Sequence, residues 1–223
     1  MASLTLVIGN RNYSSWSMRP WFALKAAGIT FEEKVIPLFE EGYKEEIALH
    51  SPSARVPCLI HGDVVVWESL AILEYLAETF PEAALWPADP KIRAHARAAA
   101  SEMHAGFQAL RATLQMNLRQ RIPGHGQTPE VMENVARIEA LWAGCKAVSG
   151  QNGPFLFGDR PNAVDAMFAP VVTRFRTYAT PLTPASQAYV EAILATPAMA
   201  EWDKLAQEEP WVIDIYEAGS AKG

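Results

Sequence analysis

The sequence predicts an α/β N-terminal domain followed by an all-α C-terminal domain. Short apolar runs and helical segments alternate over the first third of the chain, in the order βαβ-α-ββα. After that, only helical patterns remain. A proline-rich segment separates the two patterns. We therefore expect domains over residues 1–81 and 91–223, joined by a linker over residues 82–90.

The opening of the chain predicts a β-α-β unit. Residues 4–8 form a short apolar run of the kind that is buried on both faces of a sheet, and residues 31–35 form a second run. The helical segment between them stops at Gly28, a residue type favoured after helix ends. A β-α-β order makes the two strands parallel. Residues 42–49 add another short helical stretch.

The next segment predicts a β-hairpin and a helix. Residues 58–60 and 64–67 are apolar runs that flank a His-Gly-Asp turn, so they pair as antiparallel strands. Ser69 is placed to cap the helix that follows. Pro57 has no N–H to pair, and spacing alone favours a trans bond before it, because only about 5–6% of X-Pro bonds are cis.

One long amphipathic helix is expected over residues 91–121. Met103, Phe107, Leu110 and Leu114 fall on one stripe of this helix, which predicts a core position or a dimer interface.

Capping signals mark the later helices. Asn162 and Asp165 form a capping box before an apolar helix, with Asp where Glu is usual. Other helices are expected over residues 129–148, 184–194 and 197–206. We expect the tail, residues 218–223, to be disordered.

Composition and charge exclude several classes of function. Lys plus Arg number 19 against 25 for Asp plus Glu, and the net charge is −6 without any basic run, which argues against a nucleic-acid partner. No apolar segment of 18 residues occurs, and no basic region precedes the first apolar run. We therefore expect a cytoplasmic protein with no membrane partner.

The cysteines and histidines point to no metal. Cys58 and Cys145 are far apart, and no Cys-x-x-Cys occurs, so a disulfide scaffold, a zinc ribbon and a dithiol redox site are all disfavoured. The five histidines show no metal-ligand spacing.

The first βα turn, residues 12–20, is the strongest candidate for a functional site. It contains three serines, Ser14, Ser15 and Ser17, at the start of the predicted first helix. Serine often caps the unpaired N–H groups of a helix N-terminus, and the same groups stabilise a bound anion. The serines are therefore either simple caps or hydrogen-bond donors to an anion.

The order of these features resembles the soluble glutathione transferases. Four landmarks carry the resemblance: Ser14-Ser15-x-Ser17-x-Arg19, Val56-Pro57, Glu68-Ser69, and Phe157-Gly158 through Asp165. The resemblance covers nearly the whole chain. It implies a thioredoxin-like N-terminal domain, a cis Val-Pro bond, glutathione as co-substrate, and a homodimeric enzyme of detoxification.

The resemblance also implies roles for the glutathione-binding residues. Val56, followed by Pro57, is expected to pair through its backbone with the cysteinyl part of glutathione. Glu68 is expected to bind the γ-glutamyl ammonium, and Ser69, with the helix N-terminus, its carboxylate. Arg55 is a further candidate for a glutathione-binding residue. The structural alternatives are a dipole interaction for Glu68 and simple capping for Ser69.

Ser14 is the first candidate for the hydroxyl that stabilises the glutathione thiolate, and Ser15 the second. A hydroxyl hydrogen bond to the sulfur plus the helix end is large enough to lower the thiol pKa by about 2 units without a general base.

The electrophile is expected in a cleft between the domains. Its candidate lining is Tyr13, Trp16 and His104, together with Met103 and Phe107, which suggests a small apolar electrophile. For Trp16 a packing role is an equal alternative. Arg19 either stays near the site or pairs with an acid of the second domain.

Within the family, the turn is most similar to the zeta-class pattern Ser-Ser-Cys-x-Trp-Arg-Val-Arg. Ser14, Ser15 and Arg19 match this pattern, whereas Trp16 and Trp21 stand where it has Cys and the second Arg. That Cys and Arg belong to the signature associated with maleylacetoacetate isomerisation. The first interpretation is therefore a serine-type glutathione transferase, with a glutathione-dependent isomerase as the alternative.

Two other classes of function stay open. A non-catalytic binding protein can share the fold, because fold does not secure activity. The intact set of Ser14, Val56-Pro57 and Glu68-Ser69 argues against a pure scaffold. A thioredoxin-like dithiol reductase is disfavoured, since the first βα turn contains no cysteine.

Overall fold

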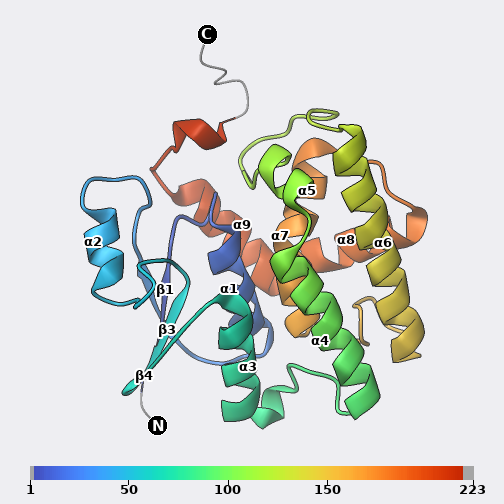
Figure 1. The fold of residues 1–223 in the computed structure, drawn as a ribbon, viewed down its shortest axis with the longest axis horizontal. Coiled ribbons are helices and arrows are strands. Elements are labelled where there is room, and N and C mark those ends of the chain that lie inside the picture. The colour runs from blue at the N-terminus through green and yellow to red at the C-terminus, as the bar shows by residue number, and fades with distance from the viewer. Residues whose placement is uncertain (1–2, 218–223) are drawn as a thin grey trace.

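A computed structural model describes residues 3–217 and shows a mixed sheet packed against a bundle of helices (Figure 1). The predicted tail, residues 218–223, lies outside the described residues. The N-terminal part contains β1 (Leu4–Ile8), α1 (Ser15–Ala26), β2 (Glu32–Val35), α2 (Tyr43–Ala48), β3 (Cys58–His61), β4 (Val64–Trp67) and α3 (Ser69–Thr79). This is the βαβ-α-ββα order that the sequence predicts.

The four strands form one sheet in the order β2-β1-β3-β4. β1 and β2 are parallel, as a β-α-β unit requires, and β3 is antiparallel to both β1 and β4. The Val56-Pro57 bond directly before β3 is cis, as the family resemblance implies. The sheet register begins at Cys58, so the backbone of Val56 lies outside it.

Side-chain alternation along β1 builds two cores. Leu4, Leu6 and Ile8 pack with α1 and α3 on one face, whereas Val7 packs with Ile47 of α2 on the other. Figure 1 shows α2 on one side of the sheet and α1 and α3 on the other. The first core continues without a break into the helical part, and α1 packs directly on α7 and α9.

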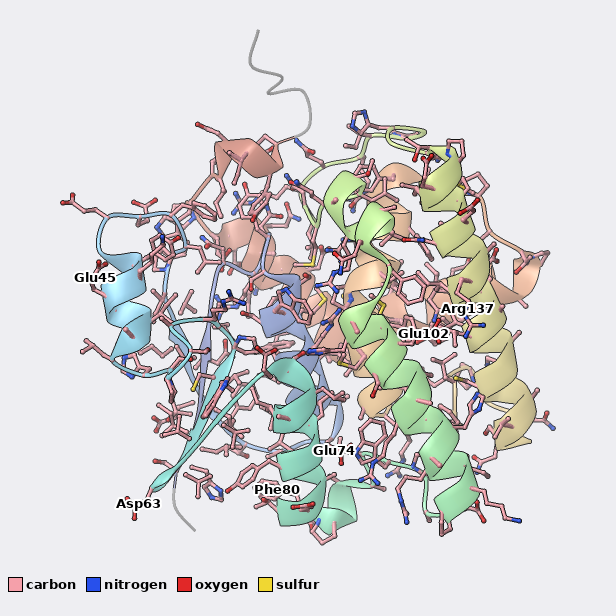
Figure 2. All side chains as sticks on the ribbon, in the orientation of Figure 1. Glu45, Asp63, Glu74, Phe80, Glu102 and Arg137 are labelled. Carbon is pink, nitrogen blue, oxygen red and sulfur yellow. The ribbon has the colours of Figure 1, made fainter. Side chains whose placement is uncertain are left out.

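The rest of the described chain is helical. It contains η1 (Pro81–Ala83), α4 (Pro90–Ala105), α5 (Gln108–Thr113), α6 (Pro129–Ser149), α7 (Ala163–Tyr178), α8 (Pro184–Leu194), α9 (Pro197–Glu208) and η2 (Asp214–Tyr216). Glu102 of α4 and Arg137 of α6 point toward one another and form an ion pair at 2.7 Å (Figure 2). No helix within residues 3–217 is both long enough and apolar enough to cross a membrane.

The prediction of one helix over residues 91–121 is wrong, because the helix stops at Gly106. Phe107 has a φ of 63°, a left-handed conformation that cannot continue an α-helix. Arg111 of α5 then donates to the carbonyl oxygen of His104 at 3.0 Å and satisfies one orphan acceptor of the end of α4. The break therefore brings Arg111 back toward the N-terminal part of the protein.

α7 is the buried centre of the helical part, and the predicted capping box starts it. Asn162 Oδ1 accepts from the Val164 N–H at 2.8 Å, and Asp165 Oδ2 accepts from the Asn162 N–H at 2.9 Å. Asp165 Oδ1 also accepts from the Leu156 N–H and from the Tyr189 hydroxyl. Burial raises the pKa of Asp165 to about 6 despite these donors.

Candidate active site

Two cavities meet at Trp16, at the N-terminal end of α1. The smaller, of about 120 Å³, is lined by Trp16, Arg55, Val56, Pro57 and Glu68. The larger, of about 380 Å³, shares Trp16. Its other lining residues include Tyr13, Ser14, Ser15, Gln108, Arg111, Gln115, Arg174 and Tyr216. The residues predicted from the first βα turn and from the cis-Pro segment therefore lie on two sides of one indole ring.

Ser14 is the N-cap of α1 and also lines the larger cavity. Its Oγ accepts from the Ser17 N–H at 3.4 Å and lies 2.8 Å from Ser17 Oγ. Ser15 lines the same cavity and is half-buried. Ser17 is fully buried and faces the end of β1, where its Oγ accepts from the Gly9 N–H at 3.0 Å. Ser14 therefore both caps α1 and lines the larger cavity.

Glu68 and Ser69 begin α3, but not as the sequence predicts. Glu68, rather than Ser69, is the N-cap, and no side-chain cap bond is present there. Glu68 has a φ of 70°, a strained conformation for a residue with a Cβ, and such conformations cluster at binding sites. Ser69 Oγ is fully buried without a hydrogen-bond partner among the described residues. The first N–H groups of α3 thus have no side-chain cap, and Ser69 lies behind Glu68 without lining either cavity itself.

His104 of α4 contacts both Trp16 and Glu68. The two rings meet edge-on with centroids 5.2 Å apart, and His104 Nε2 is 3.7 Å from Glu68 Oε2. Burial lowers the pKa of His104, and repulsion from Arg19 lowers it further against the opposing effect of Glu68. His104 lines neither cavity, so the structure does not place it in the electrophile site as the sequence predicts, and it contacts that site only through the ring of Trp16.

Two guanidinium groups lie over the Trp16 ring. Arg19 Cζ is 4.1 Å and Arg111 Cζ 4.3 Å from the ring centroid, both within the range of a cation–π interaction. Trp16 is thus a shared wall between the cavities and a support for two cations, which goes beyond simple packing.

Three arginines near the larger cavity, Arg19, Arg111 and Arg174, lack a carboxylate partner within residues 3–217. Each donates to a backbone carbonyl oxygen instead. The alternative that Arg19 pairs with an acid is therefore wrong. Burial lowers the pKa of Arg174 to about 10, and burial and the other two arginines lower that of Arg19. Surface arginines of the same chain, Arg97 and Arg137, do pair with carboxylates. The positive charge under the larger cavity is left without a counterion, which favours an anionic ligand.

The electrophile cavity differs from the sequence expectation in its lining. Met103 and Phe107 are buried in the core, whereas Arg111 and Arg174 contribute to the wall. The sequence contained a signal for them, since Arg111 and Arg174 have no acid three or four residues away on their helices.

The C-terminal segment closes over the same cavity. Tyr216 lines it and lies 5.9 Å, centroid to centroid, from Tyr13. The Tyr13 hydroxyl donates to Glu217 Oε1 at 2.6 Å, and Asn117 also donates to that oxygen. Burial, and then the bond to Glu217, raise the pKa of Tyr13. Its hydroxyl is therefore protonated at pH 7 and already committed to Glu217.

Within the described residues, no three His, Cys, Asp or Glu side chains come together in a group that could hold a metal ion.

Comparison with known proteins finds matches to both parts of the chain. Sequence models described as "Glutathione S-transferase, N-terminal domain" and "Glutathione S-transferase, C-terminal domain" match residues 13–79 and 93–206. The "Probable maleylacetoacetate isomerase" of Caenorhabditis elegans is 32% identical over 78% of this chain and 79% of the relative. "Glutathione S-transferase 1" of Dianthus caryophyllus is 32% identical over 71% and 72%.

A solved structure is similar over nearly the full length. The glutathione transferase homolog from Burkholderia gl BGR1, crystallised with bound glutathione, has a TM-score of 0.63 and 25% identity, and the match covers 93% of this chain and 100% of that one. From the matched domains and these relatives, the chain belongs to the glutathione S-transferase family.

Proposed function

We propose that this protein is a glutathione transferase in which Ser14 donates a hydrogen bond to the thiolate of bound glutathione. The observation that carries the proposal is the meeting of the two cavities at Trp16, one edged by Val56 and Glu68 and the other by Ser14. A tripeptide bound in the first cavity reaches the second with its cysteinyl sulfur. The family membership and the glutathione bound to the Burkholderia homolog support this reading.

The smaller cavity has groups for each end of the tripeptide. The free backbone of Val56 pairs with the cysteinyl unit, and Glu68 accepts from the γ-glutamyl ammonium. Ser69 Oγ and the first N–H groups of α3 donate to the neighbouring carboxylate. Arg55, exposed at the rim, offers a cation to the carboxylate at the other end.

The thiolate is the nucleophile. A free thiol has a pKa near 8.5, and lowering it by 2 units takes about 2.7 kcal/mol of preference for the anion. A hydrogen bond to a charged sulfur supplies about 1.5–3 kcal/mol and the N-terminus of α1 about 0.3–1 kcal/mol. The sulfur then attacks an electrophilic carbon, forms the C–S bond, and displaces a leaving group that departs with the electron pair.

A second candidate is a glutathione-dependent isomerase that acts on an unsaturated acid. It is favoured by Arg111 and Arg174, which line the electrophile cavity without a counterion, and by the name of the Caenorhabditis elegans relative. Here the thiolate adds to a conjugated carbon–carbon double bond and the electron pair moves onto the carbonyl. Rotation about the resulting single bond and expulsion of the thiolate then restore the double bond. The arginines favour an electrophile with a carboxylate over a purely apolar one.

The test is binding to immobilised glutathione, followed by conjugation of an activated aryl halide and isomerisation of a cis-unsaturated keto acid. We expect Ser14→Ala to bind glutathione but to lose most activity in either assay, and Ser15→Ala to retain more. Equal activity in the parent and both variants removes the serine mechanism. A parent protein without affinity for glutathione is instead a binding module of another kind.

We also propose that the protein is a homodimer of the cytoplasm. The outer strand β4 exposes Val64, Val65 and Trp67, an apolar set that supports burial against a second copy. Both cysteines are buried and unpaired, which fits a reducing compartment. Light scattering across a concentration series, on the parent and on Trp67→Lys, tests the dimer.

A further inference from the structure

The third serine of the turn is the only one of the three that cannot reach a ligand. Ser17 has no exposed surface, because it lies between α1 and the end of β1. Its Oγ is held by two neighbours, the Gly9 N–H at 3.0 Å and Ser14 Oγ at 2.8 Å. A serine that only filled space here could be an alanine, whereas this one joins the strand end to the proposed thiolate donor.

The neighbouring donors and acceptors determine which of the two serine hydroxyls donates to the other. The Gly9 N–H can only donate, so Ser17 Oγ is an acceptor there. Among the described residues, the hydroxyl of Ser17 has one acceptor within reach, which is Ser14 Oγ. If Ser14 donated instead, the Ser17 proton would be buried without a partner, a cost that folded proteins avoid.

From this geometry we infer that Ser17 is a positioning residue, whose hydroxyl donates to Ser14 Oγ and so leaves the Ser14 proton to point into the cavity. The inference rests on the proposed glutathione function and deepens it. Ser14 Oγ then accepts two bonds, from the Ser17 N–H at 3.4 Å and from the Ser17 hydroxyl. With both acceptor positions filled, its own proton is free for the sulfur.

This chain has a direction, from the Gly9 N–H through Ser17 and Ser14 to the thiolate. Each donor in such a chain polarises the next, which strengthens a hydrogen bond by roughly 10–30%. Ser15 also lines the cavity, but within residues 3–217 no comparable pair of donors to its Oγ orients its hydroxyl. The relay therefore selects Ser14 over Ser15 as the donor.

The test compares the pKa of the bound glutathione thiol in the parent, Ser17→Ala, Ser17→Cys and Ser14→Ala. The thiolate absorbance of the enzyme–glutathione complex is titrated against pH. We expect Ser17→Ala to raise this pKa by about 0.5 unit, which lowers the thiolate fraction at pH 7 from about three-quarters to about one-half for a bound thiol whose pKa is about 6.5 in the parent. Ser14→Ala raises it more, and Ser17→Cys, with a weak S–H donor, lies between the parent and Ser17→Ala.

Measurements of kcat and KM distinguish a positioning role of Ser17 from a packing role. Because Ser17 touches no ligand, Ser17→Ala lowers kcat with the KM for glutathione nearly unchanged, and Ser17→Cys restores part of kcat. Ser149→Ala is the matched control: Ser149 is a buried serine at the end of α6, outside the site, so the control leaves the thiol pKa unchanged.

An unchanged thiol pKa in folded Ser17→Ala overturns the relay. If that variant does not fold, Ser17→Gly, which also lacks a donor at this position, takes its place, and an unchanged thiol pKa there overturns the relay. Failure of the proposed function looks different, since a parent protein that binds no glutathione, or that binds it without lowering its thiol pKa, removes Ser14 as the donor as well.

Discussion

Replacing Arg111 by methionine separates an anion-binding role of the larger cavity from a structural one. The variant keeps the unbranched apolar part of the side chain but removes the guanidinium group and its charge. Arg111 donates to the carbonyl oxygen of His104 at 3.0 Å and lies over the Trp16 ring. It also repels Arg19 and Arg174, and lowers the pKa of both. The substitution therefore removes a hydrogen bond and a cation–π contact, and at the same time removes the repulsion from two neighbouring cations.

The lost contacts and the relieved repulsion have opposite effects on the free energy of unfolding, whereas the lost charge only weakens the binding of an anion. The lost hydrogen bond and cation–π contact are offset by relief of repulsion between buried cations, so we expect the free energy of unfolding to stay within about 1 kcal/mol of the parent value. A ligand carboxylate loses a charge-assisted hydrogen bond worth about 1.5–3 kcal/mol. Its affinity should fall roughly 10- to 150-fold.

Calorimetry with two glutathione derivatives measures the difference. S-(2-carboxyethyl)glutathione carries a carboxylate into the larger cavity, and S-propylglutathione fills the same space without charge. We expect Arg111→Met to weaken only the first. The control is Arg137→Met, which breaks a surface ion pair with Glu102 and should affect neither ligand. Equal weakening of both derivatives by Arg111→Met refutes the anion site.

Three further predictions concern single side chains. Ser69→Ala removes a buried hydroxyl that bonds to no described residue, so it should leave the melting temperature unchanged or higher while glutathione binds roughly 10- to 150-fold more weakly in calorimetry. Tyr13→Phe should leave the bound thiol pKa unchanged, because the Tyr13 hydroxyl donates to Glu217; a rise on spectroscopic titration would make Tyr13 the donor. The pKa of Asp165 is about 6 in the folded protein, against 3.8 for an ordinary Asp, so folding favours the neutral carboxyl. The stability that this neutral form contributes is therefore full below about pH 4 and is lost as the pH rises through 6. Urea unfolding should show the parent losing about 2 kcal/mol relative to Asp165→Asn between pH 4 and 7, and a constant difference would contradict the raised pKa.

Local patterns predicted most of the fold. The strands of the sheet, the parallel pairing of β1 with β2, and the capping box of α7 all depend on residues close in sequence. Such features are decided by alternation, turn residues and caps, which a single sequence displays. The cis bond at Val56-Pro57 came only from the family resemblance, because local propensity favours trans.

The misplaced features depend on contacts between distant parts of the chain. The hydrophobic stripe of α4 continues past Gly106, so periodicity alone could not show that Phe107 turns left-handed and that Arg111 returns to Trp16. Ser69 is also a good cap by composition, yet Glu68 takes that position with a positive φ. Propensity is a weak local preference, and tertiary contacts override it at these points.

The charges of the site are arranged unequally about Trp16, although the whole chain carries a net charge of −6. The carboxylate of Glu68 edges one cavity, whereas Arg111 and Arg174 line the other. A tripeptide whose ammonium binds Glu68 therefore directs its sulfur toward the positive side. Two opposite unit charges roughly 8 Å apart attract by about 2 kcal/mol at an effective dielectric constant of about 20, which is similar to one hydroxyl hydrogen bond. Under the proposed function we therefore expect the arginines to share with Ser14 the stabilisation of the thiolate, and the loss of Ser14 alone to leave the bound thiol more acidic than a thiol in water.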